Sequence, residues 1–211
     1  MVLLVNIDDN EKWDNTVKGF ENFDVYYLSG YVKAFHAHGD GEPKLFFYED
    51  SNIKAINVFM KRDIEKDQNF SGKIPPNTFY DAATPYGYGG FLIEGNVTDE
   101  SLRTLEKEYS ELCLNEGIIS EFVRFHPVIN NSGTVSSIYD ILELGRTVTI
   151  ELDSREKVWE GFAGNNRNKV RKAKKSGVEI FWGRSPKLFD TFIPMYNETM
   201  DNDGASGYYY F

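Results

Sequence analysis

The chain is poor in the features that mark secreted, membrane-spanning and metal-binding proteins. Its 211 residues include a single cysteine, Cys113, which excludes an intramolecular disulfide framework and fits a reducing compartment. No apolar run approaches the roughly 18 residues that cross a bilayer, and Asp8 and Asp9 follow the short apolar opening. No Cys and His residues have the spacing of metal ligands. These absences predict a cytoplasmic protein that neither spans a membrane nor uses a metal.

Basic residues are also scarce, and many of them lie in one place. The formal charge is −10, from 23 Lys and Arg against 33 Asp and Glu. Such a charge argues against a general nucleic-acid coat protein, because those proteins attract phosphates with a basic surface. Residues 167–175, however, carry six basic side chains and no acid. The sequence therefore predicts one basic patch on an acidic body.

Nucleotide-binding glycine motifs are missing as well. The segment Tyr86-Gly87-Tyr88-Gly89-Gly90 has neither the Gly-x-Gly-x-x-Gly nor the Walker spacing, and it lacks the usual acetyl-CoA loop. Its two tyrosines can stack on a sugar or a peptide. The alternative is a tight turn with aromatic cover.

The hydrophobic pattern predicts an α/β domain that ends near residue 145. Apolar residues recur at helical spacing in 25–35 and again in 102–113, where Thr98 or Asp99 can cap the helix. The β-rich runs 43–48 and 53–60 predict an antiparallel hairpin. An extended segment around 79–91 contains the glycine-rich loop, and 118–123 regains strand character. The order strand, helix, hairpin, strand, helix, strand predicts a mixed sheet flanked by helices.

A second unit is expected over residues 146–211. The alternation in 147–152 predicts a strand, and the spacing of Asp153 and Glu156 predicts the start of a helix. That helix is expected to loosen at 164–166 and to stop at Gly177. A strand over 178–182 and a helix over 186–200 should follow. We expect these elements to open a second domain that is incomplete at its C-terminal end.

Three local sequences together resemble the Fem-type (FemABX) aminoacyltransferases and the related GNAT-like acyltransferases. They are Thr-Pro-Tyr-Gly-Tyr-Gly-Gly at 84–90, Glu-Phe-Val-Arg-Phe-His-Pro at 121–127, and Asn-Asn-Arg-Asn-Lys-Val-Arg-Lys-Ala-Lys-Lys-Ser-Gly-Val at 165–178. A fourth, weaker match lies in 196–211. The order and spacing of these motifs extend the resemblance over residues 25–211.

The resemblance implies a function and an architecture. It implies two GNAT-like domains with a substrate cleft between them, and transfer of an acyl or aminoacyl group to an amine on a cell-envelope or polysaccharide precursor. The co-substrate it implies is an acyl-CoA or an aminoacyl-tRNA, so tRNA is a possible partner. His126-Pro127 replaces the Asp that precedes the proline in the peptidoglycan branch, which puts a muramyl-pentapeptide acceptor in doubt. Because the second domain looks incomplete, we expect this chain alone to be inactive.

Seven residues are candidate substrate contacts, while the pattern names no catalytic residue. The candidates are Tyr86, Tyr88, Arg124, His126, Asn166, Arg167 and Arg171. A histidine titrates near neutral pH, so His126 can orient or deprotonate an acceptor, or it can simply bond its neighbours at a strand end. The amides after Asn165 and the guanidinium of Arg167 predict an anion site for the phosphates of tRNA, CoA or a nucleotide sugar.

A rival interpretation needs no catalysis. In it, the chain is a binding domain that recognises a protein or nucleic-acid partner through the basic helix 167–175. A charged run of this kind is also commonly a solvated helix face. The lone Cys113 is expected to pack in the core, as unpaired cysteines usually do.

Overall fold

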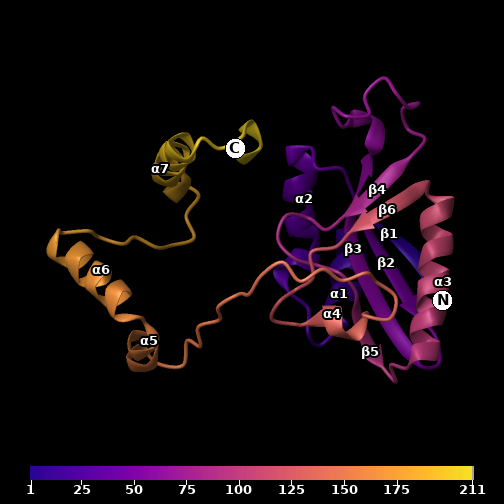
Figure 1. Ribbon diagram of the computed structural model, residues 1–211, viewed down its shortest axis with the longest axis horizontal. Helices are drawn as coiled ribbons and strands as arrows, with labels where there is room; N and C mark the ends of the chain where they lie inside the picture. The colour runs from indigo at the N-terminus through magenta and orange to yellow at the C-terminus, as the bar shows by residue number, and fades with distance from the viewer. Residues whose placement is uncertain (211) are drawn as a thin grey trace. The chain divides into compact units, whose positions relative to one another are not determined.

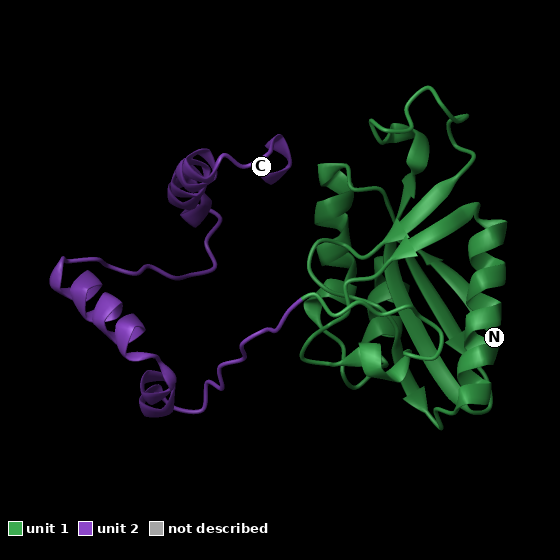
Figure 2. Cartoon of the chain, viewed as in Figure 1, with its two compact units in different colours: residues 1–144 green, residues 145–211 purple. Residues whose placement is uncertain are grey.

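A computed structural model describes residues 1–210, and the chain divides into two compact units, Met1–Leu144 and Gly145–Phe211 (Figures 1 and 2). All of the strands belong to the first unit. Within the described residues, no helix is long and apolar enough to span a membrane.

The first unit is built on a six-stranded mixed sheet in the order β1-β2-β3-β4-β6, with β5 also paired to β3. The strands are β1 (Val2–Asn6), β2 (Glu42–Glu49), β3 (Ile53–Asp63), β4 (Tyr80–Ala83), β5 (Leu92–Gly95) and β6 (Ile118–Phe122). The expected hairpin is confirmed as β2 and β3. Asp50 Oδ1 fixes its turn by accepting hydrogen bonds from the amides of Asn52 at 2.7 Å and Ile53 at 2.8 Å.

Strand β3 divides its outer edge between two partners, and this division places the glycine-rich loop. Residues 53–56 pair with β5, whereas residues 60–63 pair with β4. The chain between β4 and β5 therefore passes the middle of β3, where a Cβ on Gly89 would lie 3.8 Å from the carbonyl oxygen of Val58. Strands β4 and β6 run parallel, and all other pairs are antiparallel.

Helices cover both faces of the sheet because successive residues of a strand point to opposite faces. On one face, Leu45 of β2 packs in a cluster with Trp13 of α1 (Asn10–Lys18) and Val32 of α2 (Ser29–His38). On the other face, Phe46 packs in a second cluster with Leu105 of α3 (Asp99–Asn115). The short helices of this unit are η1 (Val25–Tyr27), η2 (Ile64–Lys66) and α4 (Asn131–Thr134).

Two of the helices test the sequence analysis directly. Thr98 caps α3 as expected, in a capping box in which Thr98 Oγ1 and Ser101 Oγ each accept the other residue's amide hydrogen. Cys113 lies buried on the inner side of α3, and burial raises the pKa of its thiol to about 12. Helix α1 was not expected, although Asp9 caps it through the amide of Lys12.

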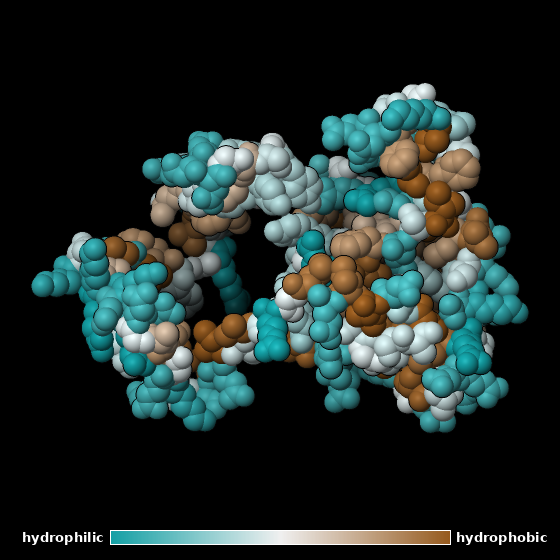
Figure 3. All heavy atoms as spheres, viewed as in Figure 1, coloured by the Kyte–Doolittle hydropathy of each residue, from teal (hydrophilic) through white to brown (hydrophobic). Residues whose placement is uncertain are grey.

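The second unit contains helices only, within its described residues. They are α5 (Arg155–Gly161), α6 (Gly164–Lys175), α7 (Leu188–Asp203) and η3 (Gly207–Tyr209). The expected strands at 147–152 and 178–182 are wrong here, because neither segment has a neighbouring strand to satisfy its backbone groups. Their apolar side chains lie in the open: Val148 is 90% exposed and Trp182 is 91% exposed. In Figure 3, hydrophobic surface lies beside hydrophilic surface.

The expected single helix after residue 153 is two helices. Ser154, rather than Asp153, supplies the cap, because Ser154 Oγ accepts the amide hydrogen of Lys157 at 3.2 Å. Helix α5 then ends at Gly161 and α6 begins at Gly164, so the expected loosening is a full break. Gly177, with φ of +76°, follows the end of α6 as predicted.

Candidate substrate-binding site

Residues 85–88 form a loop that leaves the sheet between two hydrogen bonds to the chain around β6. The amide of Thr84 donates to the carbonyl of Phe122 at 3.1 Å, and the amide of Gly89 donates to the carbonyl of Arg124 at 2.9 Å. Gly89 also forms a parallel bridge with Phe125. The two ends of the loop are therefore only two residues apart on the opposing strand, and the four residues between them are displaced from the sheet.

The glycines of this loop allow close packing. Gly87 has φ of +118°, and a Cβ there would lie 2.4 Å from Cε1 of Tyr26. Gly90 has φ of +90°, and a Cβ there would lie 2.9 Å from Cδ1 of Phe125. Residues with side chains rarely adopt such φ values, and the space is already filled. The glycines thus bring the loop against neighbouring rings, and nothing in their arrangement resembles a phosphate-binding turn.

An aromatic cluster supports the loop from η1 and α2. The ring of Tyr26 meets the rings of Tyr31 and Tyr88 edge-on, with centroids 5.1 and 5.7 Å away. Phe35 stacks on Tyr86 at 6.2 Å. Burial, reinforced by nearby phenols and Asp24, raises the pKa of Tyr31 to about 12, so this phenol is a hydrogen-bond donor at neutral pH. The cluster holds the loop in place without supplying a base.

Tyr86 and Arg124 are both exposed to solvent and lie next to each other. Tyr86 is 49% exposed, and the guanidinium carbon of Arg124 lies 5.9 Å from the centroid of its ring. Among residues 1–210, no hydrogen bond or ion pair occupies that guanidinium. An exposed ring beside an unpaired guanidinium can contact an apolar sugar face and an adjacent carboxylate or phosphate at once. The 86–90 loop and the end of β6, which carry two of the motifs, lie side by side.

His126 is close to the loop, but it is occupied. Its ring lies 5.5 Å from that of Tyr88, and the residue is only 4% exposed. Nδ1 accepts the amide hydrogens of Val128 at 3.2 Å and Ile129 at 3.1 Å, so Nε2 carries the proton and donates to Asp24 Oδ2 at 3.0 Å. Neither nitrogen can accept a proton from a substrate amine. The geometry thus favours the structural alternative over a catalytic role.

Asn131 links the parts of this region, and sequence analysis missed it. Its Oδ1 accepts the amide hydrogen of His126 at 2.9 Å, while Nδ2 donates to the carbonyls of Gly89 at 2.9 Å and Phe91 at 3.1 Å. The side chain is buried, so water cannot reach its polar atoms and these bonds satisfy them instead. Sequence spacing could not have revealed this residue, because two of its partners, Gly89 and Phe91, lie about 40 positions earlier in the chain.

A partly buried carboxylate, Glu121, belongs to β6, and sequence analysis also missed it. Glu121 Oε1 accepts hydrogen bonds from Asn57 Nδ2 and the Tyr109 hydroxyl, both at 2.9 Å, and Oε2 accepts one from the Tyr139 hydroxyl at 2.7 Å. Burial raises the pKa of Glu121, although the three donors act in the opposite direction. Through Tyr139, this carboxylate fastens the segment that follows α4 to the core.

The second unit uses its two candidate arginines internally. Arg167 Nη1 donates to the carbonyls of Phe162 at 2.6 Å and Glu160 at 3.1 Å, so it satisfies the C-terminal end of α5. The guanidinium of Arg171 lies 5.3 Å from the centroid of Trp159, also in α5. The expected anion site is corrected accordingly, because these guanidinium groups already hold α5 and α6 together.

The remaining candidate, Asn166, lies exposed in the first turn of α6. The N-cap residue is Ala163, which has no side chain to accept the first amides. Those amides are therefore open, as expected, but the adjacent guanidinium of Arg167 is turned toward carbonyls. Within the described residues, no group of three or more His, Cys, Asp or Glu side chains is arranged to hold a metal ion.

Comparison of the chain with models of known protein families, with curated proteins and with solved structures finds no match. The Fem-type resemblance therefore rests on the motifs alone. Its functional implications are developed below as proposals.

Proposed function

We propose that the chain serves a GNAT-like N-acyltransferase that acts on an amine of a cell-envelope or polysaccharide precursor, with an acyl-CoA or aminoacyl-tRNA as donor. The observation that carries the proposal is the exposed Tyr86–Arg124 pair at the junction of the parallel strands β4 and β6. The mixed sheet with helices on both faces supports the proposal at the level of fold class. The motifs at 84–90 and 121–127 meet at this one place.

In this proposal the site binds and orients the acceptor. Tyr86 covers one face of a sugar ring, and the guanidinium of Arg124 pairs with a neighbouring carboxylate or phosphate. Holding the amine against the acyl carbonyl can lower the barrier by about 7–11 kcal/mol without any covalent enzyme intermediate. His126 takes no part in proton transfer, because its hydrogen bonds fix Nε2–H toward Asp24.

Acceptor binding tests this function directly and does not depend on turnover. The probe is UDP-N-acetylglucosamine, a product analogue that occupies the acceptor site with its sugar nitrogen already acylated, and the measurement is saturation-transfer NMR with calorimetry. Tyr86→Ala should weaken binding about two- to tenfold, since an aromatic contact contributes about 0.5–1.5 kcal/mol. Arg124→Ala should weaken it too, with a loss that shrinks as salt is added.

Arg103→Ala is the matched control for Arg124→Ala. Arg103 is an exposed arginine of α3, which covers the opposite face of the sheet. The proposal fails if the probe does not bind, or if the Arg103 and Arg124 variants bind it equally well.

The rival function, partner binding through helix α6, is supported by the lysines of that helix. Lys169, Lys172, Lys174 and Lys175 are exposed and have no ion pair among residues 1–210. A phosphate backbone bound to them should dissociate steeply with added salt. Titration of a short RNA duplex against wild type and Lys172→Ala would detect this. Binding that does not depend on Lys172 or on salt excludes it.

A further inference from the structure

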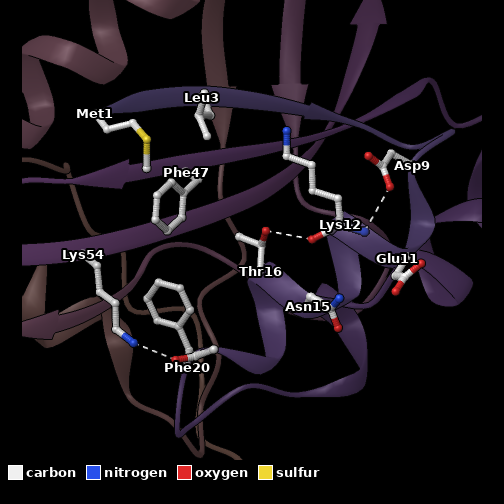
Figure 4. A pocket seen from close by; sticks show the side chains of 11 residues that line it. Met1, Leu3, Asp9, Glu11, Lys12, Asn15, Thr16, Phe20, Phe47 and Lys54 are labelled. Carbon is white, nitrogen blue, oxygen red and sulfur yellow. Dashed lines mark hydrogen bonds between the residues drawn. The ribbon is translucent and has the colours of Figure 1, made fainter.

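A hollow lies on the surface of the first unit, separate from the Tyr86 loop. It has a volume of about 680 Å³ and opens between the flank of α1 and the ends of strands β1, β2 and β3 (Figure 4). None of its lining residues belongs to the aromatic cluster around Tyr86. Pockets for small ligands typically measure about 300–1,000 Å³, so this hollow is large enough for one.

The floor of the hollow is apolar because α1 stops short of the strand ends. Leu3 and Phe47 are cross-strand partners on the face that α1 covers, and Leu3 is still 36% exposed. Phe20, which follows α1, closes one side and is 3% exposed. Met1, at the edge of the sheet, is 62% exposed. These side chains continue the core cluster of Trp13 out to the surface.

The rim carries two lysines in different situations. Lys54 is fully engaged: its Nζ lies 2.8 Å from Glu94 Oε2 and 2.6 Å from the carbonyl of Gly19. Lys12 has no ion pair among residues 1–210, and only its backbone groups are bonded, to Asp9 and Thr16. Figure 4 shows the Lys12 side chain extending from α1 toward the strand that carries Leu3.

We propose that this hollow binds a small amphipathic anion with a flat or branched apolar body and a single acidic group. The body lies on Leu3, Phe20 and Phe47, and the acidic group pairs with the ammonium of Lys12. The commitment to an anion follows from charge, because Lys12 lines the hollow and its ammonium has no ion pair among residues 1–210. The commitment to one negative charge follows from Asp9 and Glu11, which also line the hollow and disfavour a dianion.

Two matched probes test the proposal on the full chain. The first is 8-anilinonaphthalene-1-sulfonate, and the second is N-phenyl-1-naphthylamine, which has the same rings without the sulfonate. Fluorescence titration should show tighter binding of the sulfonate. Lys12→Met should weaken the sulfonate up to about fivefold, the range of a solvent-exposed ion pair, and leave the neutral probe unchanged.

Two further variants locate the probes. Lys33→Met removes an exposed lysine of α2 that does not line the hollow and should change neither titration. Leu3→Ser should weaken both probes, because it removes part of the apolar floor. Near-ultraviolet circular dichroism of each variant confirms that the fold is retained.

Three results would overturn the proposal. The first is equal affinity for the two probes in the wild type. The second is a Lys12→Met titration indistinguishable from that of Lys33→Met. The third is Leu3-dependent self-association in sedimentation with no binding of either probe, which would make the hollow an interface between copies.

Discussion

The hydrogen bond from Tyr139 to the partly buried Glu121 should contribute measurably to stability, in a manner that depends on pH. Tyr139→Phe removes the hydroxyl that donates to Glu121 Oε2 at 2.7 Å and leaves the carboxylate with two donors, Asn57 and Tyr109. A hydrogen bond to a charged group contributes about 1.5–3 kcal/mol, and a bond between neutral groups about 0.5–1.5 kcal/mol. We therefore expect the larger loss where Glu121 is ionised.

The sign of the pH dependence follows from the pKa of Glu121. Burial raises that pKa above its unfolded value, so the folded state holds the proton more tightly. The contribution of Glu121 to stability is then full below the unfolded pKa and is lost as pH rises through the folded pKa. Tyr139→Phe removes a donor that lowers this pKa, so it should shift the loss to higher pH and deepen it. Glu121→Gln, which does not titrate, should flatten the curve.

Urea denaturation followed by far-ultraviolet circular dichroism at several pH values measures these effects. Tyr210→Phe is the matched control, because the Tyr210 hydroxyl donates to Asp201 Oδ1 at the same 2.7 Å but on the surface. It should change stability little at any pH. Equal losses for the two Phe variants, or a Tyr139→Phe loss that ignores pH, would refute an ionised and hydrogen-bonded Glu121.

Three other outcomes follow from the geometry. Gly87→Ala should lower the melting temperature and displace the Tyr26 ring in NMR spectra, because its Cβ would lie 2.4 Å from that ring. Gly72→Ala is the control for backbone strain alone, about 1 kcal/mol, because Gly72 has φ of +72° and no atom within 4 Å of the added Cβ. Asn131→Ala should cost about 1–3 kcal/mol in urea denaturation for each buried partner left unsatisfied. Cys113 should resist Ellman's reagent until urea unfolds the chain, since its thiol is buried.

Local patterns predicted the elements whose causes are local. The hairpin was predictable because the β-rich runs flank a turn in which Asp50 bonds to amides two and three positions ahead. Helix α3 was predictable because Thr98 and Ser101 satisfy each other within one turn. The segment 147–152 has an equally good strand pattern, but a strand also requires a neighbour, and none pairs with it among the described residues.

The sequence indicated several residues of the candidate site, but it did not predict what each of their side chains binds. The motifs named the 84–90 loop and the end of β6 as candidate contacts, but the parallel pairing of β4 with β6 that brings Tyr86 close to Arg124 was not predicted. In the sequence, Glu121 cannot be distinguished from the many exposed acidic residues. Only the fold shows that three donors converge on its carboxylate. Sequence spacing also could not distinguish a histidine with a free nitrogen from His126, whose two nitrogens are both bonded.

The three candidate arginines show that sequence alone does not reveal what a guanidinium binds. A guanidinium can bind a phosphate, or it can donate to the last carbonyls of a helix, which have no amide donor within the helix. Sequence alone does not distinguish these two uses. The break between α5 and α6 settles the matter for Arg167, because it brings the carbonyls of Glu160 and Phe162 within reach. The guanidinium of Arg124 lies 5.9 Å from the centroid of the Tyr86 ring and has no hydrogen bond to a carbonyl among residues 1–210. Arg124 is therefore the arginine on which the proposed acceptor site depends.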